Sequence, residues 1–163
     1  MELLIKRAIR GDTDAFIELM EENKRMLYKV AKGYLRSEED IADVLQDTVL
    51  AAFEHIGELK KPAYFRTWLT RILINRCLDI IRDGQRMAVW DDMPEQIYFN
   101  QEMHQLEFMQ SLELLPEDSR MIFLLYYGEK FRTKEIAELL NINENTVKTK
   151  LRRGRQYLAD VIQ

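Results

Sequence analysis

A run of basic side chains near the C-terminus is the first group whose residue types and spacing could do chemistry. Between positions 145 and 158 the chain has no carboxylate, and its cations are Lys148, Lys150, Arg152, Arg153 and Arg155. Cations grouped in this way can follow the phosphates of a nucleic acid. The whole chain has a net charge of −4, so this local run, not the total charge, indicates a nucleic-acid partner.

The sequence from 133 to 151 has the pattern of a helix-turn-helix. Two short helices, Thr133 to Leu140 and roughly Glu144 to the C-terminus, are predicted on either side of Asn141-Ile142-Asn143. The apolar residues that would hold them together across a tight turn are Ile136, Ala137, Leu140, Ile142, Val147 and Leu151. Asn143 can cap the second helix.

The exposed side of the second helix would carry side chains that can bond base edges and phosphates in a major groove. They are Glu144, Asn145, Lys148, Thr149, Arg152 and Arg153. The alternative is a helical hairpin with a solvated basic face. A hairpin explains Ala137 and Val147 but not a basic run without carboxylates, so the pattern favours a recognition helix.

The elements that must position these residues are predicted to be helices, so the expected fold class is all-α. Gly and Pro are scarce, and apolar residues recur at intervals of three and four. A long helix should follow the capping residues 11–14, with its apolar stripe at Phe16, Leu19, Met20, Met26, Leu27, Val30, Ala31 and Tyr34.

Two further helices complete the N-terminal part of the prediction. One begins at Ser37, which resembles the first residue of a capping box, and its predicted buried stripe is Ile41, Val44, Leu45, Val49, Ala52, Phe53 and Ile56. The other begins at Pro62 and ends near Arg82, with core candidates Phe65, Trp68, Leu69, Ile72, Leu73, Cys77, Ile80 and Ile81. Three such helices can enclose a small core.

Two small helical domains joined by a flexible linker are expected. Helical periodicity fails between Gly84 and Gln101, where polar, acidic and bulky residues surround Pro94. The predicted domains are residues 1–83 and 102–163, with 84–101 as the linker.

Several classes of protein are disfavoured by composition. A single cysteine and two histidines provide neither an internal disulfide nor a metal-ligand cluster. No apolar run approaches the length that spans a bilayer, and the N-terminus lacks signal-peptide features, so a cytoplasmic protein is expected. An enzyme is disfavoured because no Gly-rich phosphate loop or nucleophile motif is present. We expect no metal, cofactor or small-molecule substrate.

Two parts of the sequence resemble the extracytoplasmic-function sigma factors of bacterial RNA polymerase. Residues 115–155 resemble the fourth conserved region of that family, and residues 40–53 and 65–79 resemble its second region. Both regions in this order make a specific match that covers nearly all of the chain outside the linker. The resemblance implies an alternative sigma factor that binds core polymerase and directs transcription from particular promoters.

The resemblance also implies where the polymerase binds. The helix matching residues 40–53 docks in the family on the clamp helices of the largest subunit, and the fourth region meets the flap of the second-largest subunit. Asp43, Gln46 and Asp47 match the exposed polar contacts of that helix. Carboxylates and an amide on one face suit a partner helix bearing Arg and Lys. An ordinary solvated face is the alternative for each of these residues.

The helix from Phe65 to Arg82 matches the element that opens the minus-ten promoter element and holds an extruded base. Opening without covalent chemistry requires stacking and edge contacts that a base pair cannot offer. Asn75 matches a position that lines the base pocket, and Arg66, Arg71 and Arg76 are candidates for the DNA backbone. Trp68 matches the family tryptophan, with a core role as the alternative, while Cys77 is expected to fill the core.

The recognition helix of the family reads the minus-thirty-five element. Lys148, Thr149 and Arg152 match positions that face bases, Lys150, Arg153 and Arg155 are candidates for phosphates, and Asn145 joins them at the start of the helix. Lys148-Thr149-Lys150 departs from the Lys or Arg, then Ser, then Arg of many relatives. The departure leaves the exact base preference open.

Regulation by an anti-sigma factor, often membrane-anchored, is a further implication of the resemblance. Such a partner would cover the polymerase-binding faces, and the acidic linker would let it hold both domains. A conventional helix-turn-helix regulator is the alternative function, but it explains only the C-terminal half of the chain.

Overall fold

The computed structural model describes residues 1–84 and 110–162, and the predicted linker lies outside the described residues except for Gly84. The chain divides into two compact units, Met1–Pro94 and Glu95–Gln163. Every regular element in the described ranges is a helix, which confirms the all-α prediction. None of the helices in these ranges combines the length and the apolar character needed to cross a bilayer.

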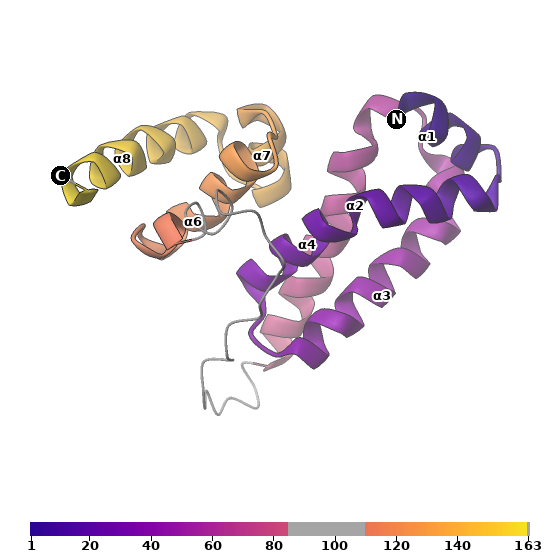
Figure 1. Cartoon of the computed structure of the whole chain (residues 1–163), viewed down its shortest axis with the longest axis horizontal. Helices are drawn as coiled ribbons and strands as arrows, with labels where there is room; N and C mark the ends of the chain where they lie inside the picture. The colour runs from indigo at the N-terminus through magenta and orange to yellow at the C-terminus, as the bar shows by residue number, and fades with distance from the viewer. Residues whose placement is uncertain (85–109, 163) are drawn as a thin grey trace. The chain divides into compact units, whose positions relative to one another are not determined.

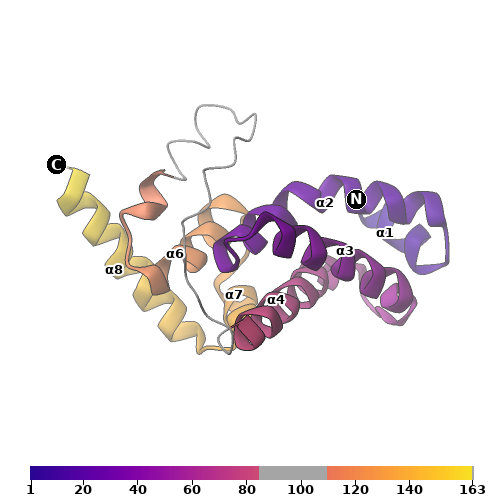
Figure 2. The same cartoon turned by 90° about the horizontal axis from the view of Figure 1, so that it is seen from below.

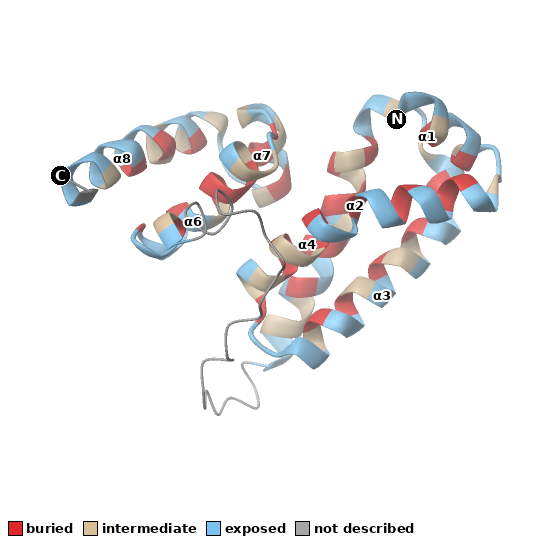
Figure 3. Ribbon diagram, in the orientation of Figure 1, coloured by how far each residue is buried: buried red, intermediate tan, exposed pale blue. Residues whose placement is uncertain are grey.

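The N-terminal unit is a bundle of three long helices with a short helix beside it (Figure 1). The helices are α1 (Glu2–Ile9), α2 (Thr13–Tyr34), α3 (Glu38–His55) and α4 (Phe65–Gly84), with single 3₁₀ turns at Ile56–Glu58 (η1) and Pro62–Tyr64 (η2). Helices α2, α3 and α4 each contact the other two, and α1 packs on α2. This arrangement leaves one long side of α3 and one of α4 at the surface (Figure 3).

Side-chain caps set the beginnings of α2 and α3. Asp12 Oδ1 accepts a hydrogen bond from the Ala15 backbone N–H at 3.1 Å, and Ser37 Oγ accepts one from Asp40 at 3.3 Å. Both residues stand at the N-cap, where a short polar side chain replaces a missing intrahelical acceptor. The capping residues expected from the sequence are therefore confirmed.

The core of the N-terminal unit contains most of the predicted apolar stripes. Its members include Phe16, Leu19, Leu27, Val30, Ile41, Val44, Ala52, Phe65, Leu69, Leu73, Ile74 and Cys77. Trp68, Ile72, Ile80 and Ile81 are only half-buried. The predicted core of α4 was therefore too wide, because three bundle helices cover only part of the circumference of each.

One member of the predicted stripe of α3 was wrong, and two others, Leu45 and Val49, are only half-buried. Phe53 is 53% exposed and lies edge-on to Phe16, with ring centroids 5.3 Å apart, so it covers the bundle from outside. Thr48 is fully buried instead. Its hydroxyl donates to the Val44 carbonyl at 2.7 Å, which removes the cost of burying a polar group.

The C-terminal unit packs three helices and a π-helical turn around a second core (Figure 2). Residues 110–113 are helical, followed by α6 (Glu117–Phe123), the π-helical turn η3 (Leu124–Gly128), α7 (Thr133–Leu140) and α8 (Glu144–Ile162). Helix α8 contacts both α6 and α7. The core residues are Leu112, Leu115, Ile122, Phe123, Leu124, Leu125, Phe131, Ile136, Leu139, Val147 and Leu151.

The apolar set predicted for the helix-turn-helix is confirmed except at its turn. Ile136, Ala137, Val147 and Leu151 are buried, but Ile142 is 36% exposed. Leu140 is half-buried. Leu139, and not Leu140, is the buried leucine near the end of α7. The helix ends at Leu140, and the turn that follows it faces solvent.

Candidate nucleic-acid and polymerase interfaces

The turn between α7 and α8 is fixed by two asparagines. Asn141 adopts the left-handed backbone conformation, with φ of 55°, and ends α7. Asn143 Oδ1 accepts a hydrogen bond from the Asn145 backbone N–H at 2.8 Å. Asparagine tolerates the left-handed region and caps helices through its side-chain oxygen. The two residues therefore determine where the basic helix α8 begins.

The exposed side of α8 carries two arginines that have no ion-pair or hydrogen-bond partner among the described residues. Arg152 and Arg153 are both exposed, as is Asn145, and Thr149 is half-buried. A residue is turned by about 100° from the one before it. These four residues consequently lie on the side of α8 opposite Val147 and Leu151, which face the core.

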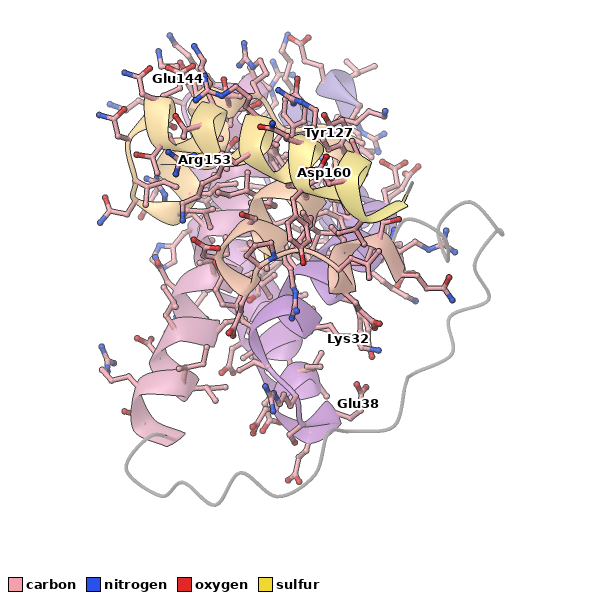
Figure 4. All side chains as sticks on the ribbon, turned by 90° about the vertical axis from the view of Figure 1, so that its left-hand side faces the viewer. Lys32, Glu38, Tyr127, Glu144, Arg153 and Asp160 are labelled. Carbon is pink, nitrogen blue, oxygen red and sulfur yellow. The ribbon has the colours of Figure 1, made fainter. Side chains whose placement is uncertain are left out.

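The three other cations of α8, Lys148, Lys150 and Arg155, each contact another side chain of the protein. Lys148 Nζ lies 3.7 Å from Glu144 Oε1, which also accepts a hydrogen bond from the Thr133 hydroxyl at 3.0 Å. Arg155 Nη1 donates to the Tyr127 hydroxyl at 3.0 Å. Figure 4 shows Glu144 at the start of α8 and Arg153 further along the same helix. The predicted recognition residues thus divide into an unpaired outer group and a group held at the flanks.

Lys150 is the most strongly held of the predicted DNA contacts. Its Nζ donates to Asp118 Oδ2 of α6 at 2.5 Å, and its side chain is 29% exposed. The hydrogen bond from Lys150 is the main reason why the pKa of Asp118 is lowered. A salt bridge therefore joins α6 to α8 on one flank of the basic helix.

The predicted polymerase-binding residues share the exposed side of α3. Asp43, Gln46 and Asp47 are all exposed, and the apolar Leu50 beside them is 56% exposed. Neither carboxylate forms an ion pair with another described residue. The structure therefore brings the three predicted residues together as an unpaired acidic face with an apolar neighbour.

Helix α4 groups three of the five predicted minus-ten residues. Trp68, Arg71 and Asn75 follow one another at intervals of three and four and so lie on one side of the helix. Trp68 is half-buried, with its ring centroid 6.1 Å from that of the buried Phe65, while Arg71 and Asn75 are exposed.

The other two predicted minus-ten residues lie elsewhere on α4. Arg76 is exposed on a flank of the row formed by Trp68, Arg71 and Asn75, and the half-buried Arg66 lies about half a turn away from that row. The structure therefore does not bring these arginines together with Asn75.

Cys77 is held inside the bundle, as predicted, and is fully buried. Burial raises the pKa of its thiol to about 12 and that of the nearby Tyr34 hydroxyl also to about 12. A thiol protonated at neutral pH is a poor nucleophile. Within the described ranges, no group of His, Cys, Asp or Glu side chains has the arrangement of a metal site.

Sequence reasoning missed the partners of the basic helix. Asp118 and Tyr127 lie far from α8 in the chain, and nothing in their local sequence indicated the contacts with Lys150 and Arg155. Glu144 was assigned to the exposed side because of its polarity, whereas its carboxylate ties α8 to Thr133. Only the i to i+4 spacing of Glu144 and Lys148 could have signalled an ion pair.

Comparison with known proteins identifies both units. Residues 19–87 match the model of sigma-70 region 2, and residues 105–158 match that of sigma-70 region 4. The ECF RNA polymerase sigma factor SigW of Bacillus subtilis is 30% identical, and the alignment covers 97% of this chain and 96% of SigW. The chain belongs to the extracytoplasmic-function (ECF) sigma factors. It is therefore an alternative sigma factor that directs transcription initiation.

Other sigma factors match over a similar extent. RNA polymerase sigma factor SigV of Bacillus subtilis is 28% identical over 87% of both chains. The solved structure of CnrH in complex with the cytosolic domain of CnrY is 25% identical, with a TM-score of 0.68, covering 99% of this chain and 96% of CnrH. The structure of RpoE with the anti-sigma factor NepR from Bartonella quintana, at 18% identity and a TM-score of 0.72, shares the fold.

Proposed function

We propose that this sigma factor divides its work between the two units: the N-terminal unit binds core polymerase and opens the minus-ten element, and the C-terminal unit reads the minus-thirty-five element. The observation that carries the proposal is the opposite charge of two exposed helix faces, acidic on α3 and basic on α8. An acidic face suits a basic protein partner and is repelled by DNA, whereas the arginines of α8 attract phosphates.

The α3 face would bind the clamp helices of the largest polymerase subunit through Asp43, Gln46 and Asp47. Two carboxylates without partners among the described residues keep their charge available for Arg or Lys of the polymerase. Charge pairs of this kind accelerate association and exclude wrong partners more than they add affinity. In this proposal the C-terminal unit also meets the flap of the second-largest subunit.

The α4 side that carries Trp68, Arg71 and Asn75 would hold the unpaired strand of the minus-ten element. An aromatic ring, a cation and an amide at successive turns can stack on a base, bind the backbone and bond a base edge. Arg76 would reach the backbone from the flank. Arg66 lies too far around the helix to join the same contact and is proposed for a neighbouring phosphate.

The outer side of α8 would enter the major groove at the minus-thirty-five element. Arg152, Thr149 and Asn145 would reach base edges, together with Lys148 once it leaves Glu144. Arg153 is proposed for a phosphate, and Arg155 for another, with the Tyr127 hydroxyl holding its guanidinium.

Residues 1–83 and 102–163 are proposed as separately folded domains with 84–101 as a flexible linker. The protein would act in the cytoplasm without catalytic chemistry or a cofactor of its own. An anti-sigma factor, possibly membrane-anchored, would cover the acidic face of α3 and block polymerase binding.

Transcription in vitro tests the proposal directly. Core polymerase with this protein should initiate at a subset of promoters, and scrambling the sequence near position minus thirty-five should reduce initiation from them. Core polymerase alone is the control. A protein that binds the same DNA equally well without core polymerase and supports no initiation would instead be a conventional helix-turn-helix regulator.

A further inference from the structure

Lys150 of α8 and Asp118 of α6 form a salt bridge, whose role as inferred below rests on the proposed reading of DNA by α8. Charge and position in the sequence assign Lys150 to a DNA phosphate. Its geometry differs from that of the outer arginines, because its amine donates to a carboxylate of another helix at 2.5 Å and its side chain is 29% exposed.

The side chain of Lys150 projects from α8 in a different direction from the residues proposed to face DNA. Thr149 and Arg153 lie about 100° and about 60° around the helix from Lys150, whereas Leu151 of the core lies about 100° away on the other side. Lys150 thus stands at the border between the outer side and the core. Its amine is carried toward α6, not toward the groove that Arg152 and Asn145 would enter.

Asp118 is suited to hold this lysine, although its own side chain is 63% exposed. It lies in the first turn of α6, where the helix dipole favours a negative charge. The bond from Lys150, backbone hydrogen bonds and the positive charge of Lys150 all hold the pKa of Asp118 below its ordinary value. The carboxylate is therefore ionised throughout the neutral range and available to Lys150.

We propose that Lys150 is a brace and not a DNA contact, and that Asp118 acts through it as a positioning residue that sets the angle of α8 against α6. The same helices also meet at Gly154, which lies against Phe123. The salt bridge and this close packing fix α8 at two points, so the outer residues reach the DNA in one orientation. A loss of the brace should loosen α8 without removing a phosphate contact.

Hydrogen exchange of the full-length protein tests the brace independently of DNA. Asp118→Asn and Lys150→Met should each speed amide exchange in α6 and α8 by about 1.5-fold to fivefold. The double variant should be no faster than either single variant, because both remove the same bond. Glu117→Gln is the matched control, since it removes a carboxylate from the same turn of α6 and should leave exchange in α8 unchanged.

The salt dependence of promoter binding by the reconstituted holoenzyme tests the second half of the inference. Arg153→Met should lower the slope of log K against log salt concentration by about 0.9, the value for one phosphate contact. Lys150→Met should weaken binding with an unchanged slope, and Lys150→Arg or the exchanged pair Asp118→Lys with Lys150→Asp should restore part of the affinity.

Two results would overturn the brace. One is a slope that falls as much for Lys150→Met as for Arg153→Met while exchange in α8 stays unchanged. The other is tighter promoter binding with a steeper slope for Asp118→Asn, which would mean that the carboxylate competes with DNA for the lysine. A wild-type holoenzyme indifferent to the minus-thirty-five sequence would instead contradict the proposed function, and the exchange measurements would still decide on the brace.

Discussion

Gly154 of α8 lies directly against the ring of Phe123 in α6. A β-carbon built on Gly154 would stand 2.4 Å from Phe123 Cε2, 2.5 Å from Cζ and 3.3 Å from Leu115 Cδ2. Such distances are well inside van der Waals contact, so glycine is required here by packing. Helix α8 can approach α6 this closely only because position 154 has no side chain.

Gly154→Ala should therefore destabilise the C-terminal unit although alanine is the better helix former. The gain in helix propensity is about 1 kcal/mol, whereas overpacking a core costs about 1–3 kcal/mol. The Phe123 ring is itself buried and has little room to move. We expect faster amide exchange in α6 and α8 and a lower melting temperature of the full chain.

Gly84→Ala is the control for that substitution, because a β-carbon at Gly84 in α4 meets nothing within 4 Å. It should leave stability unchanged or slightly raised.

Phe123→Leu combined with Gly154→Ala should be more stable than the sum of the two single effects predicts, since the smaller leucine side chain leaves space for the β-carbon at position 154. Additive effects would show that the ring is not the obstacle.

The fold could be predicted from the sequence largely because helical periodicity and caps are local signals. Asp12, Ser37 and Asn143 cap the helices that their sequences indicate. The stripe from Phe16 to Ala31 is buried as its spacing predicts. These residues report on their own helix, so a single sequence is sufficient to find them.

The sequence was least informative where the surroundings of a side chain depend on a partner distant in the chain. Phe53 was predicted to be buried, yet whether an apolar residue at the edge of a stripe is covered depends on how α2 and α3 cross. Lys150 was predicted to contact DNA from its local sequence alone, and its salt bridge with Asp118, 32 positions away, leaves no local pattern that could have been found. Gly154 gave no signal for the same reason, since its role depends on the ring of Phe123.

Asp47→Ala should weaken association with core polymerase, mainly by slowing it. The carboxylate is exposed and has no ion-pair partner among the described residues, so its removal costs the folded protein little. Losing an interface charge of this kind should reduce affinity about threefold to tenfold, with a smaller difference at high salt. Association rates measured at two salt concentrations test this.

Glu18→Ala is the matched control for the core-binding prediction, because Glu18 is an exposed carboxylate on α2. It removes the same charge from the same unit and should leave the association rate nearly unchanged. An equal loss for both variants would indicate a general effect of net charge and contradict a docking face on α3.

Arg152→Ala should reduce initiation from promoters that depend on the minus-thirty-five element. Arg152 is exposed on the outer side of α8 and has no partner among the described residues. The loss of a base contact costs about 1–3 kcal/mol and relaxes the preference for one base pair. Initiation should be measured on a set of promoters with each base pair of that element changed in turn.

Arg10→Ala, which removes an exposed cation from the N-terminal unit, is the control for Arg152→Ala. It should lower initiation only slightly, and equally at every promoter of the set.

Lys148→Ala should reduce initiation in the same way as Arg152→Ala, although more weakly, because Lys148 must first leave Glu144. Unaltered base preference in both α8 variants would exclude these residues from base contacts.

Stability of the N-terminal unit should fall at alkaline pH through the ionisation of Cys77 and Tyr34. Burial raises the pKa of each to about 12, above the ordinary values of 9.0 and 10.0. The folded state therefore retains these protons while the unfolded chain loses them, and stability is full below pH 9 and declines between about pH 9 and pH 12. The Cys77→Val variant should show no decline from the thiol and should begin to lose stability only near pH 10, where Tyr34 ionises in the unfolded chain but not in the folded protein. Urea unfolding followed by the fluorescence of Trp68, in a background in which Trp90→Phe removes the second tryptophan, measures the effect at one-unit intervals of pH. Identical pH profiles with and without Cys77→Val would contradict it.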